Sequence, residues 1–254
     1  MVLLGSNDPA PFSIFNADSS SNLLFTSDHN GSTIPTKLKN LGVPLNELRR
    51  HVAYDIGIDA VAHALSARFN ATLIVANYSR LVIDCNRHPG SAGSIPSVSD
   101  NTVVPGNKNL SDDDIKSRED EIFDAYHSSV GNRISIMRSE NKNPILISLH
   151  SFTPVIGGQF RPWEIGILFK DDERLSAPLI NKLREQKDLN IGDNKPYSGS
   201  EPAGYTVDYH VEPLSLPSVA VEFRQDLIEF ETGAVRWANI FGDALDHVLT
   251  SKIS

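Results

Sequence analysis

Short apolar runs alternate with longer amphipathic stretches along most of the chain. An apolar run bounded by turn residues such as Gly, Pro, Asn and Asp is typical of a buried strand. The first run opens at Leu23 and stops in Ser-Asp-His-Asn-Gly, which indicates a strand that ends in a sharp turn. The other predicted strands are Thr72–Asn77, Leu81–Asp84, Ile145–His150, Ile165–Phe169 and Ser218–Phe223.

Between these runs, apolar residues recur at the spacing of one helix face. Ser111 is followed by three aspartates, which is a good helix start because the hydroxyl caps the first turn and the acids complement the helix dipole. The predicted helices are Leu45–Tyr54, Ile58–Phe69, a helix from Ser111 to beyond Met137, Leu175–Lys187 and Phe230–Leu249.

Strands that are apolar on both faces and alternate with helices belong to a sheet covered by helices on both sides. No internal repeat and no linker divides the chain. We therefore expect one α/β domain over residues 1–254, with residues 1–22 as an extended arm. Two long segments, 85–110 and 188–209, are predicted to be loops, and loops of that length are usually functional or mobile.

The composition is that of an ordinary soluble globular protein, with 40% hydrophobic and 22% charged residues among 254. The formal net charge is −9 and no Lys/Arg run is present, so no nucleic-acid partner is expected. No segment has eighteen or so uninterrupted apolar residues, so no membrane partner is expected either. The single cysteine, Cys85, rules out an intrachain disulfide. The first residues lack the basic and apolar regions of a signal peptide, so a cytoplasmic protein is expected; the oligomeric state stays open.

Three predicted strands carry chemistry-bearing residues at or near their ends: His29, His150 and Glu222. In an open α/β sheet the ligand crevice lies outside the carboxyl ends of the strands. If these strands are neighbours, the three side chains share one site. Imidazole is a common zinc ligand, and a catalytic zinc has about three protein ligands. The spacing alone gives equal weight to a metal site and to two turn histidines.

A third metal ligand would be a carboxylate, and Asp28, Asp55 and Asp59 are the alternatives. From the residues alone, Asp55 is better explained as the N-cap of the following helix, and Asp59 as a partner of its dipole. All three therefore remain open as ligands.

Glu222 stands inside the apolar run Val-Ala-Val-Glu-Phe-Arg, where a charge is rarely tolerated without a partner. An ion pair with Arg224 is one interpretation, but we favour a general base. Arg80 and Arg87 flank the predicted strand Leu81–Asp84, and a guanidinium suits a substrate carboxylate. A cysteine nucleophile at Cys85 is disfavoured, and no GxSxG elbow supports a serine hydrolase.

The chain resembles the N-formylglutamate amidohydrolase family in the order and combination of several short motifs. These are SDHNGSTIP, DIGIDAVA, YSRLVIDCNR, ISLHSFTPV, RPWEIGIL, NKPYSG and VEFRQDL, over about residues 22–240. The resemblance implies a zinc-carboxypeptidase-like fold (phosphorylase/hydrolase-like), a three-layer α/β sandwich with a mixed, mostly parallel central sheet. It also implies hydrolysis of N-formyl-L-glutamate to formate and glutamate, in histidine degradation.

The resemblance implies roles for individual residues as well. His29 and His150 match metal ligands, with Asp55 as the third, for one divalent ion, taken as zinc. Glu222 matches the catalytic base and Arg80 a second cation near the scissile carbonyl. The implied substrate-binding residues are Asn86, Arg87, Arg161 and His210.

One departure is Asp28, since other members often have Pro before the histidine; an aspartate there is expected to orient the imidazole. Two further interpretations stay open. One keeps the site but changes the substrate, as a deacylase or carboxypeptidase acting on N-acetyl or N-succinyl amino acids or short peptides. The other is a non-catalytic protein that binds an anionic metabolite.

Overall fold

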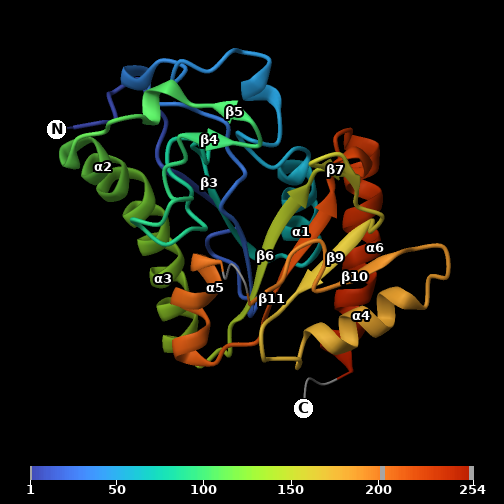
Figure 1. Ribbon diagram of the computed structural model, residues 1–254. Helices are drawn as coiled ribbons and strands as arrows, with labels where there is room; N and C mark the ends of the chain where they lie inside the picture. Colours follow the sequence, from blue (N-terminus) through green and yellow to red (C-terminus); the bar gives the residue numbers. More distant parts are fainter. Residues whose placement is uncertain (1, 201–203, 252–254) are drawn as a thin grey trace.

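A seven-stranded mixed sheet forms the centre of the molecule, with the strands in the order β1-β3-β2-β6-β11-β9-β10 (Figure 1). The computed structural model describes residues 2–200 and 204–251. Neighbouring strands are parallel except for the pairs β1–β3 and β11–β9. The strands are β1 Phe12–Phe15, β2 Leu23–Ser27, β3 Thr72–Ala76, β6 Ile145–Phe152, β9 Ile165–Leu168, β10 Ile191–Asp193 and β11 Ser218–Arg224.

Helices cover both faces of this sheet, so the fold is the expected three-layer α/β sandwich (Figure 1). One face packs against α1, α4 and α6, and the other against α3 and α5. The helices are α1 Ile58–Arg68, α2 Asp112–Arg118, α3 Asp124–Ser139, α4 Ser176–Arg184, α5 Tyr205–His210 and α6 Glu231–Thr250.

Alternation along each strand divides the buried apolar residues between two cores. Phe25 and Ile147 point into the core beneath α1 and α6, whereas Leu24 and Leu146 point into the core beneath α3. This follows from the pleat of a strand, which directs successive side chains to opposite faces. Because both faces are covered, the central strands are apolar on both sides, as the sequence indicates.

Two predicted elements are wrong. Leu45–Tyr54 forms only a short 3₁₀ turn at Glu47–Arg49. The backbone at 53–55 instead bonds to distant segments: Asp55 N–H donates to the carbonyl of His29 (2.9 Å). Leu81–Asp84 is a turn and not a strand, since Val82 N–H donates back to the carbonyl of Ser79 (2.8 Å).

Segments predicted to be irregular contain regular structure. The arm at residues 1–22 contributes β1, which pairs antiparallel with β3. The loop at 85–110 includes the hairpin of β4 (Val98–Ser99) and β5 (Thr102–Val103). The loop at 188–209 contributes β10 and all of α5 but its last residue, while residues 201–203 lie outside the described residues. A second hairpin joins β7 (Val155–Ile156) to β8 (Gln159–Phe160).

The remaining helices match their sequence signals. Ser111 caps α2 as predicted: its hydroxyl accepts the N–H of Asp114 (3.2 Å), and the Asp114 carboxylate reaches back to the Ser111 N–H (3.2 Å). A π-helical turn at Glu119–Phe123 links α2 to α3. Within the described part of the chain, no helix has the length and apolar character needed to cross a bilayer.

Candidate functional site

The three strands that carry His29, His150 and Glu222 are neighbours, which is the condition that the sequence left open. β6 lies between β2 and β11 in the sheet. β6 and β11 run parallel in a register that places Glu222 opposite His150. Since side chains of paired residues lie on the same face, the carboxylate and the imidazole share one side of the sheet, away from the apolar core that contains Leu149 and Val221.

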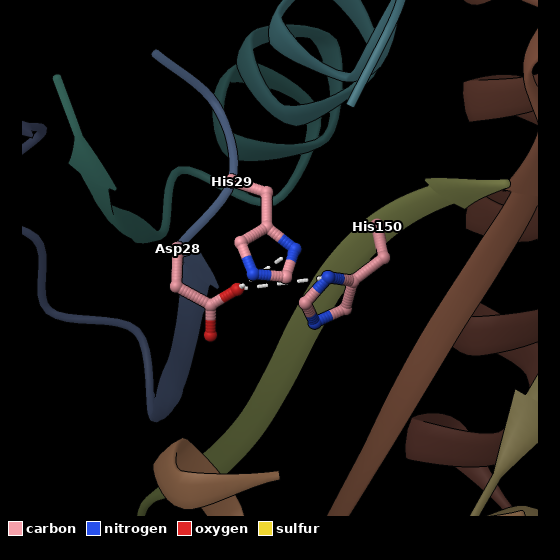
Figure 2. Close-up of side chains that lie close together, drawn as sticks. All are labelled: Asp28, His29 and His150. Atoms are coloured by element: carbon pink, nitrogen blue, oxygen red, sulfur yellow. Dashed lines mark ion pairs between the residues drawn. The ribbon is translucent and has the colours of Figure 1, made fainter. Parts of the chain in front are cut away.

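Asp28, His29 and His150 form a buried group whose side chains converge (Figure 2). Asp28 Oδ1 lies 3.7 Å from His29 Nδ1 and 3.6 Å from His150 Nδ1. These distances are too long for hydrogen bonds, but they resemble the separation of about 3.3 Å between ligands around one tetrahedral zinc. Asp28 Oδ1 is buried and has no hydrogen-bond partner, so it is the kind of orphaned atom that a cation would satisfy.

The outer nitrogen of each imidazole is held by another side chain. His29 Nε2 lies 2.7 Å from Asp84 Oδ1, and His150 Nε2 lies 2.9 Å from Ser148 Oγ. With Nε2–H donating to these oxygens, both Nδ1 atoms keep their lone pairs for a ligand inside the group. The second oxygen of Asp28 accepts the hydroxyl of Thr206 on α5 (2.7 Å), which turns Oδ1 toward the histidines. Such outer contacts are the usual support of metal-binding histidines and carboxylates.

Asp55 is a second carboxylate within reach of both histidines. Its Oδ1 lies 3.6 Å from His29 Nδ1, and its Oδ2 lies 3.3 Å from His150 Nδ1. Oδ2 also accepts the backbone N–H of Ser151 (2.9 Å). The N-cap of α1 is Gly57, so the side chain of Asp55 does not have that role. Asp59 is exposed and accepts a hydrogen bond from Asn30 instead.

The site has a strong preference for positive charge. Burial and the neighbouring Arg80 act to lower the pKa of His29, but Asp84, Asp28 and Asp55 outweigh them and raise that pKa to about 10. Burial acts to raise the pKa of the Asp84 carboxyl, but Arg80 and His29 hold it well below its usual range. Several buried carboxylates need compensating charge, and a divalent cation between the histidines would supply it.

Sequence reasoning missed Asp84, because Leu81–Asp84 was predicted to be a strand. The sequence contains a signal for it, because Asp84 ends an apolar run and stands two residues before Asn86. In the structure Asp84 links the site together. It bonds His29, accepts two hydrogen bonds from Arg80 (3.1 and 2.7 Å) and accepts the backbone N–H of Asn86 (2.9 Å).

Glu222 lies in the same cavity with one carboxylate oxygen unpaired. It is 6% exposed, and its Oε2 has no hydrogen-bond partner. Burial raises the pKa of Glu222 to about 7. A carboxylate with such a pKa can both accept and return a proton near neutral pH. Arg224, the alternative ion-pair partner, instead bonds Asp226 (2.8 Å) and lies 3.7 Å from Glu164.

The cavity has a volume of about 600 Å³ and brings together most of the expected site residues. Arg80 lines it while paired with Asp84, and its Nη1 lies 3.7 Å from Asp55 Oδ1. Arg87 lines it without an ion pair to any described residue. The site residues in its lining are His29, Asp55, Arg80, Asn86, Arg87, His150 and Glu222.

A sequence profile of the family described as N-formylglutamate amidohydrolase matches residues 21–229, which is most of the chain. The chain belongs to the N-formylglutamate amidohydrolase family. A comparison with curated proteins found no significant match.

Two solved structures resemble this amidohydrolase over nearly its whole length. A gene product of Agrobacterium tumefaciens has 32% sequence identity and a TM-score of 0.95, with 98% of each chain covered. An N-formylglutamate amidohydrolase from Ralstonia eutropha has 19% identity and a TM-score of 0.74, with 95% of this chain and 98% of that chain covered. At that identity the second likeness shows a shared fold.

Two of the expected substrate-binding residues lie behind the cavity wall of the amidohydrolase. Arg161 is buried, donates to the carbonyl of Thr153 (2.8 Å) and to the hydroxyl of Tyr197 (2.9 Å), and stacks on the ring of Phe152. Arg161 therefore does not line the cavity itself but bonds Tyr197, whose side chain does. His210 on α5 is buried against His127 of α3.

The His127–His210 pair predicts that the amidohydrolase loses stability in mild acid. His127 Nε2–H donates to the carbonyl of Cys85 (2.7 Å), so its Nδ1 accepts from His210 Nε2–H (3.0 Å). Burial lowers the pKa of His127 to about 4, and burial together with His127 lowers that of His210 to about 3. Both folded pKa values lie below the unfolded value of 6.5. The contribution of the two neutral histidines to the free energy of unfolding is therefore complete above pH 6.5. It is lost as the pH falls toward 4, by about 1.4 kcal/mol per pH unit for each histidine.

Urea unfolding between pH 4 and 8 measures this dependence. His210→Gln should flatten the fall in unfolding free energy below pH 6.5 relative to wild type, whereas the exposed His247→Gln should leave it unchanged. Equal slopes for wild type and His210→Gln would contradict the assignment.

Proposed function

We propose that this chain is a metal-dependent amidohydrolase that removes the acyl group from a small N-acylated acidic amino acid, with N-formyl-L-glutamate as the expected substrate. The family supports the amide bond as the target. One observation carries the proposal: a buried, unpaired Glu222 carboxylate lies in the same cavity as the convergent Asp28, His29 and His150 group.

The residues of this group fit one zinc ion. Two imidazole nitrogens and a carboxylate oxygen form the donor set that catalytic zinc sites use. A divalent ion held there would polarise the acyl carbonyl and lower the pKa of a bound water to about 7. We propose His29, His150 and Asp28 as its ligands. Each carboxylate has one hydrogen-bonded oxygen, but the other oxygen of Asp28 is buried without a partner, whereas that of Asp55 lies 3.7 Å from the Arg80 guanidinium.

Proton transfer, substrate binding and stabilisation of the oxyanion are assigned to other residues of the cavity. Glu222 takes a proton from the attacking water and passes it to the leaving amine nitrogen, as a general base and then a general acid. Arg87 has no ion-pair partner among the described residues and donates only to the carbonyl of Asn86 (3.1 Å), so its guanidinium can bind a substrate carboxylate. Arg80 is held by Asp84 at the cavity wall, where its charge stabilises the developing oxyanion.

The test is hydrolysis of a panel of amides by the purified protein. N-formyl-L-glutamate should be cleaved, N-formyl-L-leucine should be a poor substrate because it lacks the side-chain carboxylate, and chelation followed by Zn²⁺ should remove and restore activity. Activity that is indifferent to chelators would exclude the metal mechanism. Binding without turnover over hours would favour an anion-binding role.

A second function is a deacylase with the same site and a larger acyl group. The cavity volume of about 600 Å³ favours it, because this is more space than a formyl group uses. N-acetyl and N-succinyl amino acids in the same panel distinguish it.

A further inference from the structure

The cavity beside the metal group is larger than a formylated amino acid requires. Its volume of about 600 Å³ is in the range that binds drug-sized ligands. Formylglutamate is a single amino acid extended by one carbon, so it fills only part of this space. The rest is available to substrate atoms that formylglutamate lacks.

The additional space extends along β11, away from Glu222. On the cavity side of β11, Ala220 and Ser218 follow Glu222 toward the start of the strand, and Ser148 lies on the neighbouring β6. All three side chains are small. Within β11, Ala220 is the one residue that is not buried, although the strand lies inside the sheet. From Glu222 to Ser218 the strand extends about 13 Å.

Opposite these small side chains, the space is lined by apolar side chains from β9, α5 and the segment after α5. We call the space the β11 channel and define it by Leu168, Val207, Val211, Leu216, Ser218 and Ala220. Among the described charged residues that line the far part of the cavity, both cations are paired with carboxylates, and the exposed Asp171 carboxylate has no ion pair. Lys170 bonds Glu212 (2.7 Å), and Arg174 bonds Asp172 (2.6 Å). The channel therefore offers contact area to a neutral chain but no free cation for a carboxylate.

The cations for an acidic amino acid lie on the opposite side of the metal group. Arg80 and Arg87 belong to the segment that follows β3, and β3 is separated from β11 by β2 and β6. Among the described residues Arg87 has no ion-pair partner, in contrast to Lys170 and Arg174. An amide above the metal group thus directs its acidic amino acid toward Arg87 and its acyl group toward β11.

We propose that the β11 channel binds the acyl chain, so that the substrates include N-acyl acidic amino acids with an unbranched aliphatic acyl group longer than formyl. This inference rests on the proposed function. Water adds to the amide carbonyl and the C–N bond breaks. The acyl chain leaves as a carboxylic acid on the channel side, and the amine leaves on the Arg87 side after receiving the proton that Glu222 holds.

The test compares N-formyl, N-acetyl, N-butyryl and N-hexanoyl-L-glutamate with the metal-loaded protein. The acetyl, butyryl and hexanoyl amides have the same carbonyl chemistry, so differences among them report binding of the chain. We expect kcat/KM to rise by about tenfold or more from acetyl to hexanoyl, because each added methylene is removed from water.

Ala220→Leu places a larger side chain in the channel, and the ratio of hexanoyl to acetyl kcat/KM should fall toward one. The matched control is Ala67→Leu on the exposed face of α1, which should keep the wild-type ratio. Should Ala220→Leu fail to fold, Ser218→Val narrows the same channel from the next cavity-facing position.

The outcomes separate the two proposals. If the ratio of hexanoyl to acetyl kcat/KM is at or below one in the wild type, the acyl chain does not bind in the channel. The same conclusion follows if the ratio is high but both channel variants leave it unchanged. Failure to hydrolyse any of the four amides overturns the proposed function itself.

Discussion

Replacing Glu222 by glutamine should lower kcat by about 10²–10⁴-fold while the protein still binds its metal. Glutamine has nearly the same shape but cannot take a proton from water. The unpaired Oε2 and the pKa raised to about 7 by burial are the features expected of a base in this position. Steady-state hydrolysis of N-formyl-L-glutamate and metal content per chain are the two measurements.

The matched control is Glu229→Gln, because Glu229 is exposed. It should retain wild-type kcat and metal content. If Glu222→Gln keeps full activity with metal bound, Glu222 is not the base. If the variant loses its metal as well as its activity, the carboxylate contributes to metal binding, and the base has to be sought elsewhere in the cavity.

His29→Gln and Asp28→Asn should each weaken binding of Zn²⁺ by more than about 100-fold, the upper end of the effect seen when only an outer partner of a ligand is lost. The first change removes an imidazole donor, and the second replaces a charged carboxylate oxygen by a neutral amide oxygen, in a group whose atoms lie 3.6–3.7 Å apart. Competition against a chromophoric chelator measures the affinity. Asp59→Asn is the control, because Asp59 is exposed and outside the group.

Asp55→Asn decides between the two carboxylates. We expect Asp55→Asn to lower the affinity for Zn²⁺ less than Asp28→Asn does, because Asp55 Oδ2 already accepts the Ser151 N–H. A larger loss would make Asp55 the third ligand, as the sequence resemblance implies. If His29→Gln, Asp28→Asn and Asp55→Asn all keep the wild-type affinity for Zn²⁺, the metal is not bound by this group.

Much of the fold was predictable because the responsible signals are local. The apolar runs at Thr72–Ala76 and Ile145–Phe152 and the helical spacing in Ile58–Arg68 each lie within one segment. Local patterns failed where distant contacts set the backbone. The segment before Asp55 has helical spacing, but its backbone bonds to His29 and Arg80, and only a 3₁₀ turn forms.

By itself, the sequence determined the fold class, the strands that carry His29, His150 and Glu222, and, through its motifs, the family. Only the tertiary structure decided which side chains meet. The order β2-β6-β11 and the register of Glu222 with His150 arise from pairing between segments far apart in the chain. Short-range periodicity specifies which face of a strand is buried, but it does not specify the neighbouring strand. For the same reason the structure was needed to place Asp84 against His29, and to show the channel that small residues leave beside β11.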